Sequence, residues 1–358
     1  MATFQEASTV QERDAEDWSE PPPPSRGSDY AELSRRVKGT GLLDRRPAYY
    51  AAKTTLTTVL LAAGWTAFFL LQDSWWQLAT AVFLAFTFTQ IGFLGHDTGH
   101  RQVFRTRRAN GLAGLVFGNL LIGLSYGWWV GKHNRHHSNP NHVDLDPDVT
   151  VGAIAFTTDQ ARAKQGLTKV IARHQAYLFF PLLLLEAAHL HAASVQAVVR
   201  GTIRSSPLAA LLLLVHGVGY LAAVLLVLSP LRAAVFVLVQ QGLFGLYLGC
   251  CFAPNHKGMP VLEEGKEPDY LRRQVLTSRN VRGSRLVDFA LGGLNYQIEH
   301  HLFPSMPRPT LRRAQPLVRA FCAERGLAYS ESSVFGAYAE ALRHLHAAGA
   351  PLRPAVTD

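Results

Sequence analysis

Histidines recur in this sequence at spacings that would place several imidazole rings on one side of a helix. The segments HDTGH, HNRHH and QIEHH carry them, and in the last a glutamine stands where a histidine opens the second. An α-helix turns by about 100° per residue, so positions i, i+3 and i+4 share one stripe, with Cβ atoms about 5–6 Å apart. Rings placed in this way can converge on one metal ion. The candidate ligands are His96, His100, His133, His136, His137, Gln297, His300 and His301.

The carboxylates near these segments are weaker ligand candidates than the histidines. Glu299 falls near the opposite side of its helix from the histidine stripe, so we exclude it from the ligands. Asp97 lies at the edge of its stripe, where a carboxylate can orient a ligand histidine through the other ring nitrogen. We interpret residues 139–148 as a capped surface turn, although its histidine and aspartates could also support the ligands.

The number of histidines indicates more than one metal ion. The three segments hold seven histidines, which exceed the four positions of a tetrahedral zinc site, so we predict two ions. Imidazole suits zinc, copper, iron and nickel, and ligand type alone therefore leaves the metal open. Six other histidines stand apart from the segments, and we interpret them as interfacial polar residues. They are His174, His189, His191, His216, His344 and His346.

The composition favours a membrane protein. Of 358 residues, 48% are hydrophobic and 17% are charged, and the apolar residues gather in long runs. A formal net charge of +9 would suit nucleic acid, but the basic residues lie between the apolar runs and in the tail, as at a membrane surface. We therefore expect no nucleic-acid partner. The 3 cysteines supply neither a disulfide framework nor a zinc-binding spacing.

Four apolar runs are long enough to cross a bilayer, which requires about 20 residues of helix. Their apolar cores contain neither an acid nor a lysine. Only a few residues separate the first run from the second and the third from the fourth, so we predict two transmembrane hairpins. The predicted spans cover residues 51–71, 75–95, 207–228 and 231–252.

Two other apolar runs, residues 111–130 and 176–194, are ambiguous by hydropathy. Segments that share one metal centre must lie on the same side of the membrane, so an even number of crossings must separate them. This condition excludes a crossing between the first two histidine segments, by residues 111–130. Three apolar runs lie between the second and third histidine segments, so the same condition requires that one of them does not cross. Residues 176–194 are the costliest of the three to bury in a membrane, because they contain Glu186 and two histidines. We assign them to the membrane interface.

The arginine-rich flanks of the spans predict that the metal site and both termini face the cytoplasm. The predicted fold is an all-α membrane protein: four transmembrane helices in two hairpins, with interfacial helices, capped by a cytoplasmic helical domain that carries the metal site. Residues 1–45 are predicted to form a disordered start and an amphipathic surface helix. Residues 46–316 would form the main domain and residues 317–358 a cytoplasmic helical tail.

The three histidine segments, in this order and with two hairpins, resemble those of the membrane-bound fatty acid desaturases over about residues 43–316. The similarity is to the branch in which glutamine opens the third segment. It implies a centre of two iron ions that uses O2 to remove two hydrogens from the acyl chain of an acyl-CoA or an acyl lipid. It also implies a further ligand, His256, just after the fourth span, with Asn255 beside it to hold a metal-bound water.

The resemblance also implies an external source of electrons. Many members of this branch carry a fused cytochrome b5 domain with a His-Pro-Gly-Gly motif, which this sequence does not contain. We therefore expect a separate ferredoxin, or a reductase with flavin and an iron–sulfur cluster, to dock on the basic cytoplasmic face. Trp128 and Trp129 are candidates to line an apolar tunnel for the acyl chain, and packing or interface anchoring is an equal alternative for them.

Three other functions fit parts of the pattern. A fatty acyl or sphingolipid hydroxylase would use the same two-iron centre and differ only after the first hydrogen abstraction. A zinc-dependent membrane hydrolase or receptor would need fewer ligands than this sequence supplies. A haem electron carrier would need paired histidines that face each other within the bilayer. The residues leave open the acyl carrier and the position of the double bond.

Overall fold

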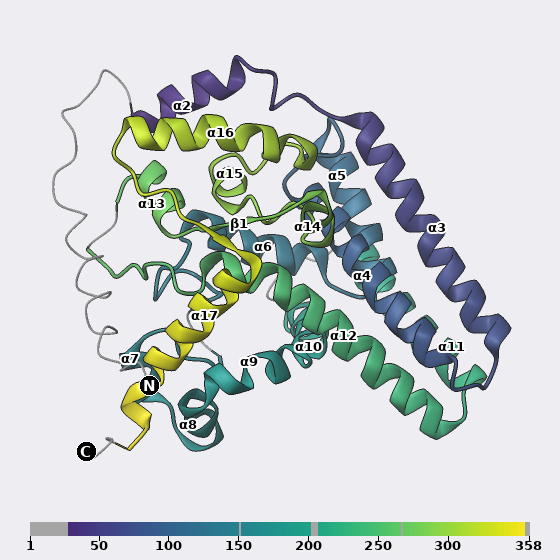
Figure 1. Ribbon diagram of the computed structural model, residues 1–358. Helices are drawn as coiled ribbons and strands as arrows, with labels where there is room; N and C mark the ends of the chain where they lie inside the picture. Colours follow the sequence, from purple (N-terminus) through teal and green to yellow (C-terminus); the bar gives the residue numbers. More distant parts are fainter. Residues whose placement is uncertain (1–27, 150–151, 202–206, 266–267, 355–358) are drawn as a thin grey trace.

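The computed structural model describes residues 28–149, 152–201, 207–265 and 268–354, and in these ranges the chain is mostly helical (Figure 1). The predicted disordered start at residues 1–27 lies outside the described residues. The helices are α2 (Asp29–Lys38), α3 (Pro47–Leu71), α4 (Gln77–Gly99), α5 (Arg107–Gly114), a π-helical segment (Leu115–Leu121), α6 (Tyr126–Ser138), α7 (Thr158–Ala163), α8 (Gly166–Arg173), α9 (Gln175–Leu183), α10 (Glu186–Val199), α11 (Pro207–Val227), α12 (Pro230–His256), α13 (Tyr270–Leu276), α14 (Arg285–Ala290), α15 (Gln297–Leu302), α16 (Arg308–Glu324), α17 (Val334–Ala348) and a final 3-10 turn (Ala350–Leu352).

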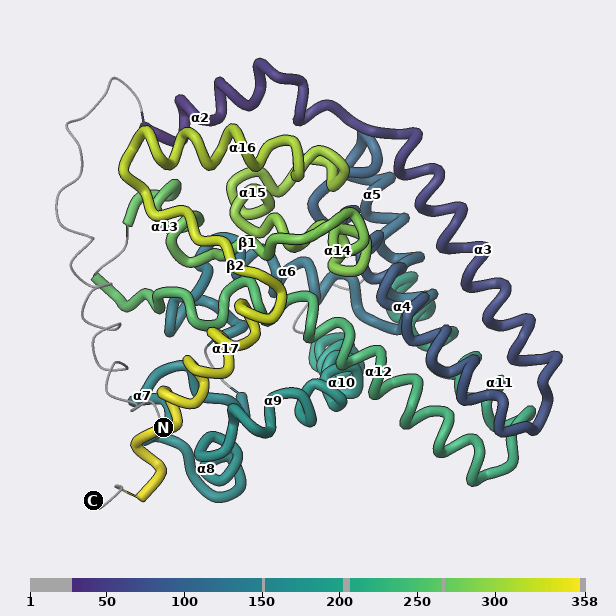
Figure 2. The backbone as a smooth tube through the Cα atoms, viewed as in Figure 1, coloured from purple at the N-terminus to yellow at the C-terminus, as the bar shows by residue number. Residues whose placement is uncertain are grey.

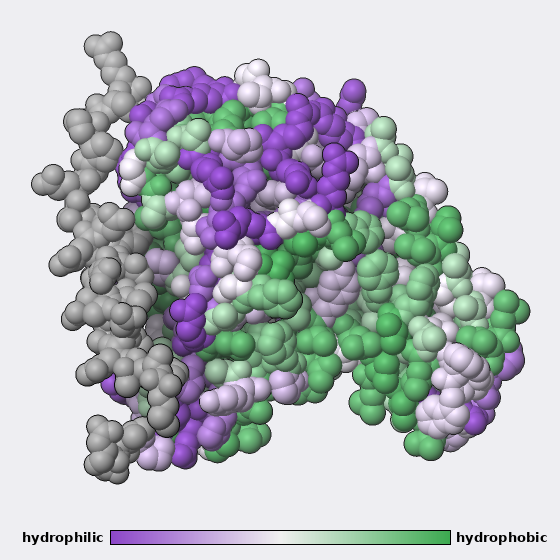
Figure 3. Space-filling model, in the orientation of Figure 1, coloured by the Kyte–Doolittle hydropathy of each residue, from purple (hydrophilic) through white to green (hydrophobic). Residues whose placement is uncertain are grey.

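Four of these helices, α3, α4, α11 and α12, are long and apolar enough to cross a membrane. Figure 3 shows hydrophobic side chains gathered over the half of the molecule that these helices form, and hydrophilic side chains over the half that contains α2 and α16. The prediction of a helical integral membrane protein is confirmed at this level. The helices extend beyond the predicted spans, because α4 continues to Gly99 and α12 to His256. These added turns carry the polar ends of both helices away from the apolar region.

The turns at the far end of the two helix pairs are tied together. The carboxylate of Asp73, between α3 and α4, accepts hydrogen bonds from the backbone N–H and hydroxyl of Ser229, at 2.8 and 3.1 Å. The guanidinium of Arg232, in the first turn of α12, lies 2.5 Å from the same carboxylate. These contacts hold the connection between α3 and α4 against the connection between α11 and α12.

The two ambiguous apolar runs form bent helix pairs. The chain bends by 113° between Arg107–Leu121 and Tyr126–Ser138. It bends by 68° between Gln175–Leu183 and Glu186–Val199. Our expectation that neither run crosses the membrane stays a prediction, because a bent pair can also be a broken span. At the first break Gly123 adopts a φ of +68°, and a Cβ atom there would lie 2.4 Å from the ring of His216. The break therefore requires glycine.

Two of the six isolated histidines stabilise this break. The Nδ1 atoms of His191 and His216 lie 2.9 and 2.8 Å from the backbone oxygens of Gly123 and Leu120, which the interrupted helix leaves without helical donors. The hydroxyl of Ser125 then accepts a hydrogen bond from a backbone N–H in the first turn and so caps α6. The break thus fixes where α6 begins, and α6 carries the second histidine segment.

The polar half of the molecule is built from both ends of the described chain. Helix α2 lies along α16, as the purple segment and the yellow-green segment beside it show in Figure 2. Leu33 and Val37 of α2 are fully buried in a core shared with α13, α15 and α16. A short parallel sheet joins β1 (Asn280–Arg282) to β2 (Glu331–Ser333). Helix α16 continues through residue 316, where we predicted the main domain to end, and that domain division stays a prediction.

Candidate metal centre

The structure brings all nine predicted ligands together, at the C-terminal ends of α4, α6 and α12 and in the short helix α15. Helix α4 supplies the first histidine segment, α6 the second and α15 the third, while His256 is the last residue of α12. The four helices meet in the middle of the molecule (Figure 1). All nine side chains are buried except that of His133, which is partly exposed. Their ring nitrogens form two neighbouring groups.

The first group joins α4, α6 and α15. Ring nitrogens of His96, His100, His133 and His300 all lie within 4.8 Å of one another. The Nε2 atoms of His100 and His133 are 2.9 Å apart, and the His96 and His300 rings have their centroids 4.8 Å apart. Residues separated by up to 204 positions thus direct imidazole nitrogens toward one point.

The second group joins α6, α12 and α15. Ring nitrogens of His136, His256 and His301 also lie within 4.8 Å of one another. The Nε2 atom of His256 is 3.3 Å from that of His136 and 3.1 Å from that of His301. The amide nitrogen of Gln297 lies 2.8 Å from the same Nε2 atom, so the glutamine belongs to this group.

His137 lies between the two groups. Its Nε2 atom is 3.1 Å from that of His133, and its ring stacks on His301 with a centroid distance of 4.2 Å. The two groups are therefore adjacent, and the structure arranges the eight histidines and Gln297 as two centres side by side.

The chemistry of the two groups fits metal ions. Among the described residues, the buried Nε2 atoms of His96 and His300 have no hydrogen-bond partner, which a ligated ion would supply. Burial lowers the pKa of five rings outside the long helices well below their ordinary value, so these rings are neutral and their nitrogens can bind a cation. They are His100, His133, His137, His300 and His301.

Asp146 supports the second group. Its carboxylate oxygens lie 3.1 and 2.9 Å from Nδ1 of His136, and its side chain is fully buried. Burial disfavours the charged form of His136, but the charge of Asp146 raises the pKa of this ring above its ordinary value. Our interpretation of residues 139–148 as a surface turn is wrong for Asp146. The alternative holds, because a capped turn folds this carboxylate inward against a histidine of α6.

Two supports were missed in the sequence. The side-chain oxygen of Gln274, on α13, lies 2.9 Å from Nδ1 of His301, and its amide donates to the backbone oxygen of His137 at 2.9 Å. The backbone oxygen of Thr277 lies 2.9 Å from Nδ1 of His256. Each contact occupies Nδ1 and so directs Nε2 toward the group. Because α13 has no histidine and no spacing pattern, nothing in the sequence pointed to Gln274.

Asp97 connects the first group to a buried arginine. Its carboxylate lies 3.2 Å from Nδ1 of His96 and 2.6 Å from the guanidinium of Arg308, at the start of α16. Arg308 also donates to the backbone oxygen of Phe93 at 2.7 Å. The contact to His96 is the one expected for Asp97, and Arg308 was not anticipated from the sequence. The pair joins the end of α4 to the polar half of the molecule.

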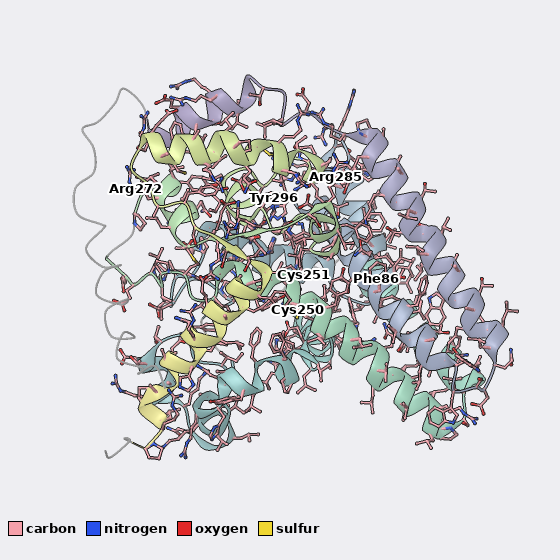
Figure 4. The ribbon with its side chains drawn as sticks, in the orientation of Figure 1. Phe86, Cys250, Cys251, Arg272, Arg285 and Tyr296 are labelled. Atoms are coloured by element: carbon pink, nitrogen blue, oxygen red, sulfur yellow. The ribbon has the colours of Figure 1, made fainter. Side chains whose placement is uncertain are left out.

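Asn255 lies beside His256 and faces the third segment. Its amide nitrogen donates to backbone oxygens of Cys251 and Leu294 and lies 3.3 Å from the side-chain oxygen of Gln297. Its own side-chain oxygen is buried and has no partner among the described residues. Figure 4 labels Cys250 and Cys251 on the adjacent turn of α12, with Tyr296, the residue before α15, above them. Asn255 thus offers a free acceptor next to Gln297.

Glu299 points away from both groups. Its carboxylate accepts hydrogen bonds from Tyr329 at 2.6 Å and from the amide of Asn280 at 2.7 Å. Burial raises the pKa of Glu299, which these two donors partly offset. Asn280 also accepts from the backbone N–H of Ile298 at 2.9 Å. These contacts hold the outer side of α15 against β1 and so fix the direction of the histidines on its inner side.

The two tryptophans have different surroundings. The ring of Trp129 stacks on His133 with a centroid distance of 4.4 Å and lies 5.6 Å from the ring of His96. Trp128 packs against the apolar core of the long helices. Trp129 therefore forms part of the wall of the first group, whereas Trp128 contributes to packing.

The fold and site define a class: a helical membrane protein with two adjacent histidine-rich groups that could hold metal ions. Comparison with known proteins agrees with it. The family model described as "Fatty acid desaturase" matches residues 73–333. The "Acyl-lipid (9-3)-desaturase" of Physcomitrium patens is 32% identical over an alignment of 334 residues, which covers 87% of this chain and 61% of that protein.

Two nematode proteins show the same similarity. The "Delta(6)-fatty-acid desaturase fat-3" of Caenorhabditis elegans is 32% identical and aligns with 88% of this chain and 74% of its own length. The "Delta(5) fatty acid desaturase fat-4" of the same organism is 30% identical and aligns with 86% of this chain and 70% of its own length. This chain therefore belongs to the fatty acid desaturase family, an oxidoreductase family that acts on fatty acids. The resemblance described above is confirmed.

Proposed function

We propose that this protein is an O2-dependent desaturase that inserts a double bond into the acyl chain of an acyl-CoA or an acyl lipid. The main support is the convergence of eight histidines and Gln297 from four helices into two neighbouring groups. Such a set has more imidazole ligands than one ion needs. The relatives named as acyl-lipid, Delta(5) and Delta(6) desaturases support an acyl chain as the substrate.

The nine side chains would hold two iron ions, one in each group. The first ion would be bound by His96, His100, His133 and His300, and the second by His136, His256 and His301. His137 and Gln297 would complete the two sets. When bound and reduced, such a pair supplies the O2 chemistry that removes hydrogen from an unactivated C–H bond.

The chain's own residues would prepare this site in three ways. Asp146, Gln274 and the backbone of Thr277 occupy Nδ1 atoms, which keeps the Nε2 atoms directed inward. Burial of the rings excludes water, which a strongly oxidising site requires. Asn255 would hold a metal-bound water through its free side-chain oxygen.

We infer that the four long helices cross the membrane as two hairpins, with the metal groups and both termini on the cytoplasmic side. Four exposed arginines follow α4 directly, next to the metal end, which favours the cytoplasm for this face. They are Arg101, Arg105, Arg107 and Arg108. At the opposite end, the charged residues in and beside the turns are Asp73 and Arg232 alone. The bent pairs would then lie on the cytoplasmic side or at the interface.

The acyl chain would reach the metal groups along an apolar path bounded by Trp129, which touches His133 and approaches His96. Electrons would come from a separate ferredoxin or from a reductase with flavin and an iron–sulfur cluster. The exposed arginines near the metal end would attract an acidic surface of that donor.

Expression in a host with defined lipids tests the proposal. We expect new unsaturated fatty acids, and locating the double bond by mass spectrometry would define the substrate position. A product that gains an oxygen, instead of losing two hydrogens, would show a hydroxylase. Zinc without iron in the purified protein would favour a hydrolase or receptor, and a Soret band would show a haem carrier.

A further inference from the structure

Lys53 is a buried lysine that forms no direct ion pair among the described residues. It lies in the second turn of α3, one residue before the apolar core of that helix, and its side chain is 8% exposed. Its ammonium group forms no ion pair among the described residues, although both charges of the buried Asp97–Arg308 pair lie close enough to act on it. A cation in a helix that crosses a membrane is costly unless it is paired, and it usually marks a function.

Neutral groups hold this ammonium in place but do not compensate its charge. The side-chain oxygen of Gln90, on α4, accepts a hydrogen bond from Lys53 at 2.7 Å. The ring of Phe289, on α14, lies 4.3 Å from the ammonium nitrogen as measured to its centroid. Gln90 is itself fixed, because its amide donates to the hydroxyl of Tyr247 at 3.1 Å. The lysine therefore has a defined position but no direct ion-pair partner among the described residues.

A cavity of about 250 Å³ lies beside Lys53, between α3, α14 and the start of α16. Its lining residues are Tyr49, Ala52, Lys53, Leu56, Asp288, Phe289 and Arg308. Asp288 does not serve Lys53, because Arg312 and the amide of Asn295 hold its carboxylate, each at 2.9 Å. The positive charge of Lys53 thus faces a space large enough for a small anionic group.

The cavity opens among side chains suited to lipid. Leu56 lines the cavity and is 47% exposed, and Val59, further along α3, is 57% exposed. Arg285, labelled in Figure 4, is exposed at the start of α14. Lys53 lies six residues after Pro47, where α3 begins, which is about 9 Å along the helix. A membrane that covers α3 would therefore place the headgroup region near this cavity.

We propose that this cavity binds the oxyanion headgroup of a membrane lipid, with Lys53 as its counter-ion. The headgroup would be the phosphate of a net-anionic phospholipid or a fatty acid carboxylate, and the tail would lie along the exposed side of α3 over Leu56 and Val59. Arg308 lines the cavity and pairs with Asp97, which contacts His96, so the lipid would lie one ion pair away from the first metal group. The proposal rests on membrane insertion and not on the desaturase assignment.

Thermal unfolding of the full chain in nanodiscs tests this site. Nanodiscs of phosphatidylcholine alone are compared with nanodiscs that also contain phosphatidylglycerol or oleate, and with added inorganic phosphate. We expect one of the two anionic lipids to raise the Tm of the wild type by several degrees. Which lipid does so identifies the phosphate or the carboxylate. In Lys53→Gln the shift should disappear, whereas Lys38→Gln, a change of an exposed lysine on α2, should keep it.

A second variant removes the space and keeps the charge. Ala52 is exposed at the rim of the cavity, so Ala52→Trp should fill the entrance without disturbing the core, and it should also lose the shift. The proposal is overturned if Lys53→Gln retains the full shift, or if neither anionic lipid stabilises the wild type. Equal stabilisation by inorganic phosphate would show a simple ion site. These readouts need no enzymatic activity, so failure here leaves the proposed desaturase reaction unaffected.

Discussion

The carboxylate of Asp146 contacts Nδ1 of His136 through both oxygens, at 3.1 and 2.9 Å. This contact orients the ring and raises its basicity as a ligand. Asp146→Asn should therefore weaken metal binding at the second group by about 10–100-fold. Metal analysis after dialysis against graded chelator concentrations measures the effect. Asp144→Asn changes an exposed aspartate of the same loop and should retain the metal, and equal retention by both variants would contradict the role of Asp146.

His300 and Gln297 should respond differently to substitution. His300→Ala removes a ring of the first group and should abolish desaturation, with loss of metal from the purified protein. Gln297→His places another imidazole beside His256, whose Nε2 atom lies 2.8 Å from the present amide, and should retain some activity. Fatty acid analysis of expressing cells and metal content give the two readouts. An active His300→Ala enzyme would refute the assignment of the first group.

Glu299 should contribute to the stability of the fold and not to metal binding. Glu299→Gln keeps the shape of the side chain but loses one acceptor for Tyr329 or Asn280, so the free energy of unfolding should fall by about 1–3 kcal/mol. Metal content per folded protein should stay unchanged, because the side chain points away from both groups. Thermal unfolding combined with metal analysis separates the two effects. Loss of one metal ion from a folded variant would place Glu299 among the ligands after all.

Arg308 should contribute far more to stability than a nearby exposed arginine. Arg308→Met leaves Asp97 buried without its 2.6 Å partner, which should cost about 3–5 kcal/mol of unfolding free energy. Arg312→Met breaks a partly exposed pair with Asp288 and should cost about 0–1 kcal/mol. Unfolding of both variants in the same detergent makes the comparison. A similar decrease in the free energy of unfolding for both variants would show that the buried pair stabilises the protein no more than the exposed one.

The metal-free protein should lose stability as the pH falls. Burial lowers the pKa of five histidine rings, whereas an unfolded histidine titrates at about 6.5. Below that pH the unfolded chain binds protons that the folded chain does not, so the free energy of unfolding decreases with decreasing pH. The raised pKa of His136 acts in the opposite direction for a single ring. The Tm of chelator-treated protein, measured from about pH 7.5 to about 5.5, should fall, and a constant or rising Tm would exclude this linkage.

Local patterns predicted the helices and the ligand set, because helix periodicity and apolar run length are properties of neighbouring residues. The spacing of the histidines on α4, α6 and α15 was sufficient to select eight side chains that the fold brings together. His256 stands alone in the sequence and was found only through the family resemblance. His256 is the last residue of α12, which extends beyond the apolar run, and a single histidine there forms no spacing pattern.

The supporting residues could not be predicted, because their contacts depend on the whole fold. Asp97 and Arg308 are 211 positions apart, and Gln274 reaches a ring on another helix. Lys53 was overlooked for a different reason. The predicted span of residues 51–71 includes Lys53, but its apolar core was counted from the next residue, so the lysine was not considered as a buried polar side chain of α3. Helix limits are set by capping and packing as well as by hydropathy.

Each histidine group draws its nitrogens from three separate helices: the first group spans residues 96–300 and the second spans residues 136–301. A chain that ends before residue 300 therefore contains neither group in full. Binding of metal in both groups would occur only after residue 301 has been made, and only a chain in which α4, α6, α12 and α15 have come together could retain the ions.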